Sequence, residues 1–268
     1  MKCSKYTKQF FRSECFMEEF PGYNSCLTGS AVASILGISP WESRQELFKR
    51  LTAGRVKGEI TWEMRRGMQY KETVFHTFSK SSPSEVFRRN PFTARKDPNG
   101  PRQNILDKNR KFYACSNICP GIGGLVDAFL VNRNTGHVAA GMMVRTSGLS
   151  SVEHWADYPP KIHVAQSLFY SGLCERLPWV ISVMLFRPDP NSNNEERIPF
   201  EIRNFWMKFD QALFEHINER VMDFWNNNFM KGVEPDDVDA TETDMLLDNY
   251  IQRKTAILRI TPPFAKKK

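Results

Sequence analysis

The sequence predicts an α/β fold in which a small mixed β-sheet is flanked by helices. Two apolar runs, 124–131 and 138–147, flank the polar stretch 132–136, and this pattern is typical of a β-hairpin. An amphipathic run over 161–174 follows and predicts a helix, and the apolar run 177–186 predicts a buried strand. Helices and strands that alternate in this way pack in layers around one sheet.

The remaining elements are predicted from apolar spacing and from residues that stop helices. The small residues of 27–37 predict a short helix that ends at Gly37, and 112–115 predicts a short strand. Three longer helices are expected at 43–51, 62–78 and 200–230. In the helix over 62–78, Gly67 is expected to lie where another element comes close, because glycine otherwise costs a helix about 1 kcal/mol.

Length and composition predict a globular protein without a membrane span. The 268 residues are enough for one large or two small domains, and 41% of them are hydrophobic. No apolar run reaches the roughly 18 residues that a spanning helix needs, and no signal-peptide core follows Met1. A soluble, intracellular protein with free thiols is therefore expected.

The net charge of +7 is unevenly placed along the chain. Residues 44–111 hold 17 Lys and Arg against 7 Asp and Glu, a local excess of 17 − 7 = +10. A basic block in a folded domain suits a polyanion such as nucleic acid. A well-solvated surface is the alternative, and charge alone leaves both open.

One acid and one base stand out in the hairpin. Asp127 lies in the first apolar run, and Arg145 lies near the end of the second. A lone aspartate within a buried-looking strand is costly unless it is paired or binds a metal. The hairpin is therefore predicted to carry a functional site.

Five segments, in order, resemble the YqaJ-type and lambda-exonuclease-like recombination nucleases, a branch of the PD-(D/E)XK fold to which viral alkaline nucleases are more distantly similar. The stretches 28–41 and 64–72 resemble the family's opening helix with its LGxSP turn and its MRxGxxxE helix. Residues 123–128 lie where the family has its SPDG aspartate. The stretch 165–172 resembles its glutamine helix, and 224–236 its closing segment.

The resemblance implies a PD-(D/E)XK nuclease-like core and a site that cuts phosphodiesters with Mg²⁺ or Mn²⁺. Oxygen-bound divalent ions neutralise phosphate and acidify the attacking water. Carried over by position, the implied catalytic residues are Asp127, Glu72, Arg145 and Gln166. Asp127 is also the implied metal ligand. Nucleic-acid contacts are expected from Ser30, Arg65 and Arg66.

The second strand of the hairpin departs from the family pattern LLEIKCP. Met143 stands at the glutamate position and Arg145 at the lysine position. A thioether is a poor ligand for a hard cation, and arginine cannot give up a proton near neutral pH. No acid lies between Val138 and Ser151, so a shift of the alignment cannot restore the ligand.

The resemblance also implies a layout and a set of partners. Residues 1–268 are expected to form one nuclease-like domain, with 79–124 as an insertion or mobile basic loop and 233–268 as a C-terminal extension. The implied partners are double-stranded DNA ends, further copies in a homo-oligomer and a single-strand annealing protein, in the host cell of a virus or phage.

Three hypotheses follow. The chain is a Mg²⁺-dependent 5′–3′ double-strand DNA exonuclease with impaired activity, or a catalytically inactive relative that binds DNA or assists recombination, or an unrelated α/β protein. Loss of the acidic ligand at Met143 favours the inactive relative, whereas the order of the five matching segments favours the nuclease.

Overall fold

Six strands form one mixed sheet in the order β1-β4-β5-β6-β7-β8. The computed structural model describes residues 27–53, 62–87, 112–115, 122–147, 153–188 and 197–260. The strands of this sheet are β1 (Ser84–Phe87), β4 (Ala128–Asn132), β5 (Val138–Ser147), β6 (Trp179–Pro188), β7 (Arg197–Met207) and β8 (Thr255–Ile260).

The predicted hairpin is formed by β4 and β5, which pair antiparallel. The connecting turn ends at Gly136, whose φ of +62° favours glycine. Strand β5 then pairs parallel with β6, and the connection between them contains helix α6 (Lys161–Leu173). Strand β7 pairs antiparallel with both β6 and β8. The expected mixed sheet with flanking helices is confirmed.

A second, two-stranded sheet pairs β2 (Phe112–Cys115) with β3 (Gly123–Val126). The N-terminal part of the described chain joins it at the Leu27–Ile122 bridge. The predicted strand over 124–131 is thus two strands, β3 and β4, which belong to different sheets. The sequence predicts Asp127 inside a strand. In the structure it lies instead at the break between β3 and β4.

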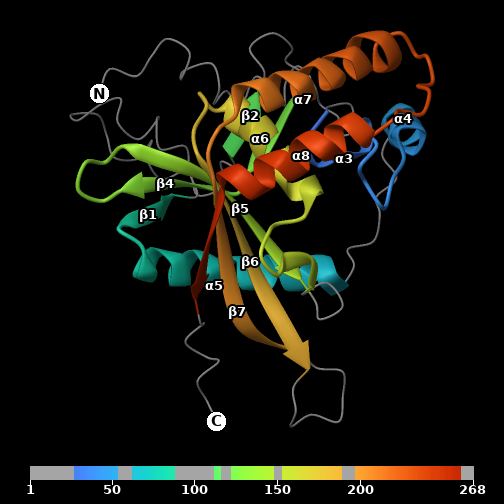
Figure 1. The fold of residues 1–268 in the computed structure, drawn as a ribbon. Coiled ribbons are helices and arrows are strands. Elements are labelled where there is room, and N and C mark those ends of the chain that lie inside the picture. The colour runs from blue at the N-terminus through green and yellow to red at the C-terminus, as the bar shows by residue number, and fades with distance from the viewer. Residues whose placement is uncertain are drawn as a thin grey trace, which may run out of the picture.

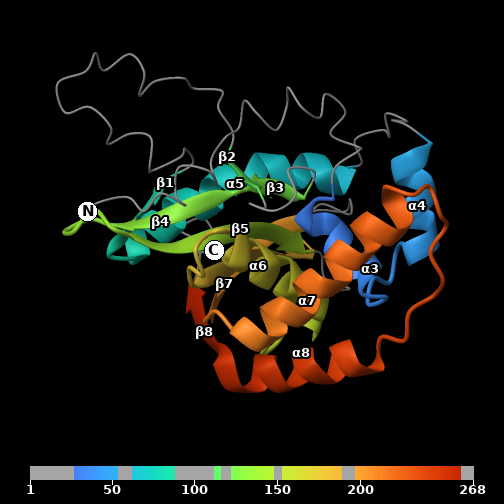
Figure 2. The same cartoon turned by 90° about the horizontal axis from the view of Figure 1, so that it is seen from above.

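Helices cover both faces of the large sheet (Figures 1 and 2). On one face lies α5 (Trp62–Ser81), whose buried Val74, Phe75 and Phe78 pack on β4, β5 and β6. The opposite face carries α3 (Val32–Ile35), α6, α7 (Gln211–Asp223) and α8 (Thr241–Lys254), as Figure 2 shows from above. The result is a helix–sheet–helix arrangement with a hydrophobic core on each side of the sheet.

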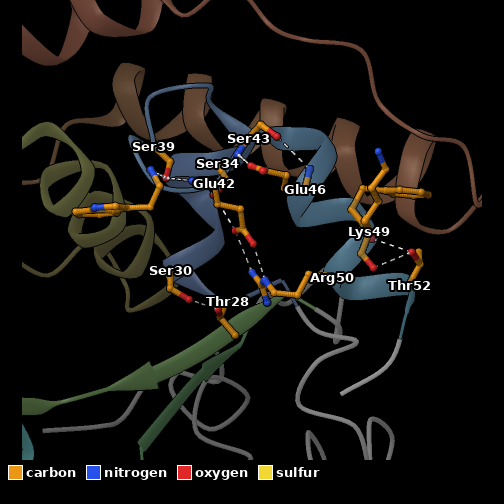
Figure 3. Close-up of polar contacts among 12 residues, drawn as sticks. Thr28, Ser30, Ser34, Ser39, Glu42, Ser43, Glu46, Lys49, Arg50 and Thr52 are labelled. Carbon is orange, nitrogen blue, oxygen red and sulfur yellow. Dashed lines mark hydrogen bonds and ion pairs between the residues drawn. The ribbon is translucent and has the colours of Figure 1, made fainter. Parts of the chain in front are cut away.

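The N-terminal helices are fixed by polar contacts (Figure 3). A short 3-10 turn, η2 (Gly29–Ala31), leads into α3, and α4 (Arg44–Thr52) follows. Ser43 and Glu46 form a capping box at the start of α4, as the boundary predicted from sequence requires. Glu42 accepts hydrogen bonds from Ser34 of α3 and from Arg50 of α4, so it ties the two helices together.

The predicted long helix over 200–230 is wrong in its first part. Residues up to Met207 belong to β7, and α7 starts only at Gln211, where Asp210 caps it by accepting from the Leu213 N–H. The side chains of β7 point alternately to the two faces of the sheet, and Ile202 and Phe205 are buried in the cores on opposite faces. This segment forms a strand and not a helix because it pairs with β6 on one side and β8 on the other.

The other predicted elements are confirmed, with helices at 44–52, 62–81 and 161–173 and strands at 112–115 and 179–188. The segment 233–268 supplies β8, an edge strand of the large sheet, and the segment 79–124 supplies β1, the other edge. Both segments therefore contribute a strand to the large sheet. No helix in the described ranges is long and apolar enough to span a bilayer.

Candidate functional site

Asp127 is held at the break between β3 and β4 by three groups. Its Oδ1 accepts a hydrogen bond from the Lys71 ammonium at 2.5 Å. Its Oδ2 accepts from the Val144 N–H at 2.8 Å and lies 3.7 Å from Nη1 of Arg145. The Asp127 side chain is only 11% exposed. A buried carboxylate needs partners, and both of its oxygens accept hydrogen bonds from groups of the protein.

Arg145 links this carboxylate to helix α6. Its Nη2 donates to Gln166 Oε1 at 2.8 Å, and its Nη1 also donates to the carbonyl of Val144 at 2.9 Å. Its Nε donates to His163 Nδ1 at 3.4 Å. The guanidinium therefore uses donors on all three nitrogens for contacts within the chain. We refer to Lys71, Asp127, Arg145, His163 and Gln166 as the Asp127 cluster.

His163 is the titratable member of the cluster whose neutral form is favoured. Burial, and then the positive charge of Arg145, lower the pKa of its imidazole well below the usual value. The ring also stacks on Trp155, with centroids 5.1 Å apart. A neutral ring can accept the Arg145 hydrogen bond at Nδ1, whereas a protonated one would repel the guanidinium.

Met143 faces the same side of the sheet as Arg145, because side chains two residues apart along a strand share a face. Met143 is 3% exposed and packs in the core between the sheet and α6. The Ser167 hydroxyl of α6 donates to its sulfur at 3.7 Å. Residue 143 is therefore an apolar side chain that shares a pocket with Asp127.

Lys71, not Glu72, is the α5 residue that contacts Asp127. Gly67, Lys71, Val74 and Phe78 follow one another at spacings of three and four and form one stripe that faces the sheet. Glu72 is one position further round the helix and is exposed. The family's helix pattern reaches its glutamate four residues after the glycine, and counting four from Gly67 gives Lys71. This count is the signal that could have found Lys71 in the sequence.

The predicted nucleic-acid residues differ in how far they are exposed. Ser30 is exposed beside α3, with its hydroxyl 2.7 Å from that of Thr28 (Figure 3). Arg65 is exposed on α5. Arg66 is buried, and its guanidinium lies over the ring of Phe186, 4.9 Å from the centroid.

A small pocket of about 60 Å³ opens beside the cluster. Asp127, Arg145 and Gln166 line it together with five further residues, which are Val126, Met142, Met143, Tyr170 and Trp179. A water molecule needs roughly 10–15 Å³, so the pocket can take a few waters or one small group. Three of the four predicted catalytic residues thus share one pocket.

Tyr170 and Trp179 form the apolar wall of this pocket. Their rings stack with centroids 6.0 Å apart, and the Tyr170 hydroxyl accepts from the Gly29 N–H at 3.2 Å. A Cβ added at Gly29 or Gly124 would lie within 2.5 Å of the Tyr170 side chain. The two glycines therefore allow Tyr170 to sit against the backbone on either side of it.

These residues do not fit a divalent metal ion. Within the described ranges, no three His, Cys, Asp or Glu side chains lie close enough together to hold one. Asp127 Oδ1 already contacts an ammonium, and the neighbouring side chain on β5 is a thioether. Mg²⁺ requires oxygen ligands in near-octahedral geometry, which this set does not offer.

The layers and sheet order define an α/β protein with a mixed six-stranded sheet and a polar cluster where β3 meets β4. Among solved structures, the chain is similar to an alkaline exonuclease (LHK-Exo) from Laribacter hongkongensis, with 14% identity, a TM-score of 0.49, and 87% of this chain and 94% of that chain covered. The chain is also similar to the complex of LHK-Exo with dAMP, with 12% identity and a TM-score of 0.49. That match covers 87% of this chain and 94% of the other. No protein-family model and no curated protein matches the chain.

Proposed function

We propose that the chain is a DNA-binding protein with a nuclease-like core that does not cleave DNA. The observation that carries the proposal is the state of Asp127, whose two carboxylate oxygens contact Lys71, the Val144 N–H and Arg145. A hydrolytic site of this type needs that carboxylate to bind an ion. Here it accepts hydrogen bonds from the protein instead.

Two further substitutions support the proposal. Met143 replaces an acid on β5, and Lys71 replaces an acid on α5, when each is placed by the family's own spacing. Only Asp127 remains of three carboxylates, and a single carboxylate holds a divalent ion weakly. Meanwhile Arg145 and Gln166, which the resemblance also brings to the site, do share a pocket with Asp127. This supports the alignment and the loss of cleavage together.

DNA as the partner is supported by charge. The chain carries a net charge of +7, and the local excess of basic residues lies within 44–111. Lys71 and Arg65 belong to this stretch, and both reach solvent. Cations of this kind bind phosphates without reading sequence, and such binding weakens as salt increases. We therefore propose the end or body of a DNA duplex as the ligand.

The test is incubation of the protein with linear, 5′-phosphorylated duplex DNA in Mg²⁺ or Mn²⁺. We expect a mobility shift that weakens with salt, and DNA that remains full length. The substitution Arg65→Ala should weaken binding several-fold and reduce the salt slope by about 1, as expected for one lost phosphate contact. The matched control is Met245→Ala, a neutral change at an exposed residue of α8.

The exonuclease hypothesis predicts a different result in the same assay. Degradation that requires the divalent ion and is abolished in a folded Asp127→Ala variant would establish cleavage and contradict our proposal. Binding that is insensitive to salt and unaffected by Arg65→Ala would contradict the DNA part of it.

A further inference from the structure

The charges of the Asp127 cluster do not balance in the way a metal site requires. Asp127 supplies one carboxylate, while Lys71 and Arg145 supply two cations within 4 Å of it. Lys71 comes from α5 on one face of the sheet, and Arg145 contacts α6 on the other. The buried carboxylate is therefore neutralised from both sides by the protein's own side chains.

We infer that the Lys71 ammonium is a built-in cation that takes the place of a divalent metal ion at Asp127. This inference deepens the proposed non-cleaving function and rests on it. The ammonium lies 2.5 Å from Oδ1, on the side of the carboxylate that the Val144 N–H leaves open. An ion at that oxygen would have to displace Lys71 or lie beside it, and like charges at such distances repel strongly in a partly buried site.

The position of Lys71 on its helix explains why this one residue decides the site. Gly67, one turn earlier, brings α5 close to β5, since a Cβ there would lie 3.5 Å from Thr146 Oγ1. Residue 71 is on the same stripe and points at the break between β3 and β4, where Asp127 lies. A glutamate at residue 71 would therefore bring a second carboxylate to Asp127. The charge of residue 71 therefore decides between two states of the site. A lysine supplies the cation at Asp127 itself, whereas a glutamate would leave the site to bind a metal ion.

The test measures thermal unfolding in the absence of DNA, with and without millimolar Mn²⁺ or Mg²⁺. The unmodified protein should show no change in Tm beyond error when the ion is added. The variant Lys71→Glu should be destabilised without the ion, because two carboxylates then face each other, and the ion should raise its Tm by at least about 3 °C. The control Lys80→Glu makes the same charge change at an exposed residue of α5 and should not respond.

Two results would overturn the inference. The first is an ion-dependent rise in the Tm of the unmodified protein that Asp127→Asn abolishes. The second is a Lys71→Glu variant that is folded by circular dichroism but whose Tm the ions leave unchanged. If Lys71→Glu does not fold, Lys71→Met and Asp127→Asn supply the test through a double-mutant cycle. The unfolding equilibrium constant of the double variant should then differ about tenfold from the value that the two single variants predict if they act independently. Additive effects of the two substitutions would also overturn the inference.

Failure of this inference is distinguishable from failure of the proposed function. The Tm measurements contain no DNA, and the variants of the DNA assay above all keep Lys71. A metal response in the unmodified protein with intact DNA would overturn only the built-in cation. Cleaved DNA would overturn the non-cleaving function together with the inference that rests on it, so the two failures give different results.

Discussion

The Ser167 hydroxyl lies 3.7 Å from the Met143 sulfur, across the interface between α6 and β5. This contact places Met143 in the core and not in a coordination shell. Both residues are nearly inaccessible, with exposed fractions of 0% and 3%. The contact therefore makes Met143 part of the packing between α6 and the sheet.

Replacing Met143 by glutamate should therefore destabilise the protein. The substitution Met143→Glu places a second carboxylate beside Asp127 at a nearly inaccessible position, which we expect to cost about 2–4 kcal/mol of the free energy of unfolding. Met143→Leu conserves volume and should cost less than about 1.5 kcal/mol. Urea denaturation measures both. Equal stability of the two variants would show that residue 143 has access to solvent or to Arg145.

Restoring two residues of the family pattern should not restore cleavage. The pair Met143→Glu with Arg145→Lys leaves Lys71 on Asp127, so the carboxylate stays occupied. We expect DNA degradation in Mn²⁺ only when Lys71→Glu is added to the pair, because only then is the ammonium at Asp127 replaced by a further carboxylate. Gel analysis of linear duplex DNA measures this. Degradation by the double variant would contradict the role we give to Lys71.

Stability should fall as the pH is lowered below about 6.5, the ordinary pKa of histidine. The folded state holds His163 neutral with a lowered pKa, whereas the unfolded chain takes up a proton near the ordinary value. The unfolded state then binds more protons in this window, so the free energy of unfolding decreases with acid. In urea unfolding between pH 7.5 and 5.0, His163→Gln should flatten this slope.

The control for this slope is His137→Gln, which alters an exposed residue of the hairpin. It should leave the slope as it is in the unmodified protein. An unchanged slope in His163→Gln would assign the acid sensitivity to other groups.

Two glycine substitutions should have opposite outcomes. A Cβ at Gly141 would lie 2.1 Å from the buried ring of Trp179, so Gly141→Ala must displace the wall of the pocket. We expect a loss of 2 kcal/mol or more, roughly that of an overpacked core. Gly67→Ala meets only Thr146 Oγ1 at 3.5 Å, and alanine favours a helix by about 1 kcal/mol. Thermal unfolding should therefore show Gly67→Ala unchanged or more stable.

Much of the fold could be predicted from local sequence, because period and turn residues act locally. The hairpin around Gly136 and the helix capped by Ser43 are examples. The error at β7 arose because Phe205 and Phe209 also fit a helical spacing, and only pairing with β6 and β8 removes the ambiguity. Such pairing depends on residues distant in sequence.

The site was predictable in part for a similar reason. Asp127, Arg145 and Gln166 could be placed by pattern, and they do line one pocket. The pairing of Asp127 with Lys71 spans 56 positions and depends on the phase of α5 relative to the sheet. A shift of one residue along a helix turns a side chain by about 100°, so a small alignment error exchanges an exposed glutamate for the lysine that contacts the site.

Strand β8 is the last part of the large sheet to be synthesised, and it covers β7 along six paired positions. Until residues 255–260 have left the ribosome, a nascent chain that has already built β6 and β7 presents an open row of backbone donors and acceptors. Such an edge can recruit strands from neighbouring chains. Premature termination before Thr255 should therefore yield polypeptides that depend on chaperones to stay dispersed.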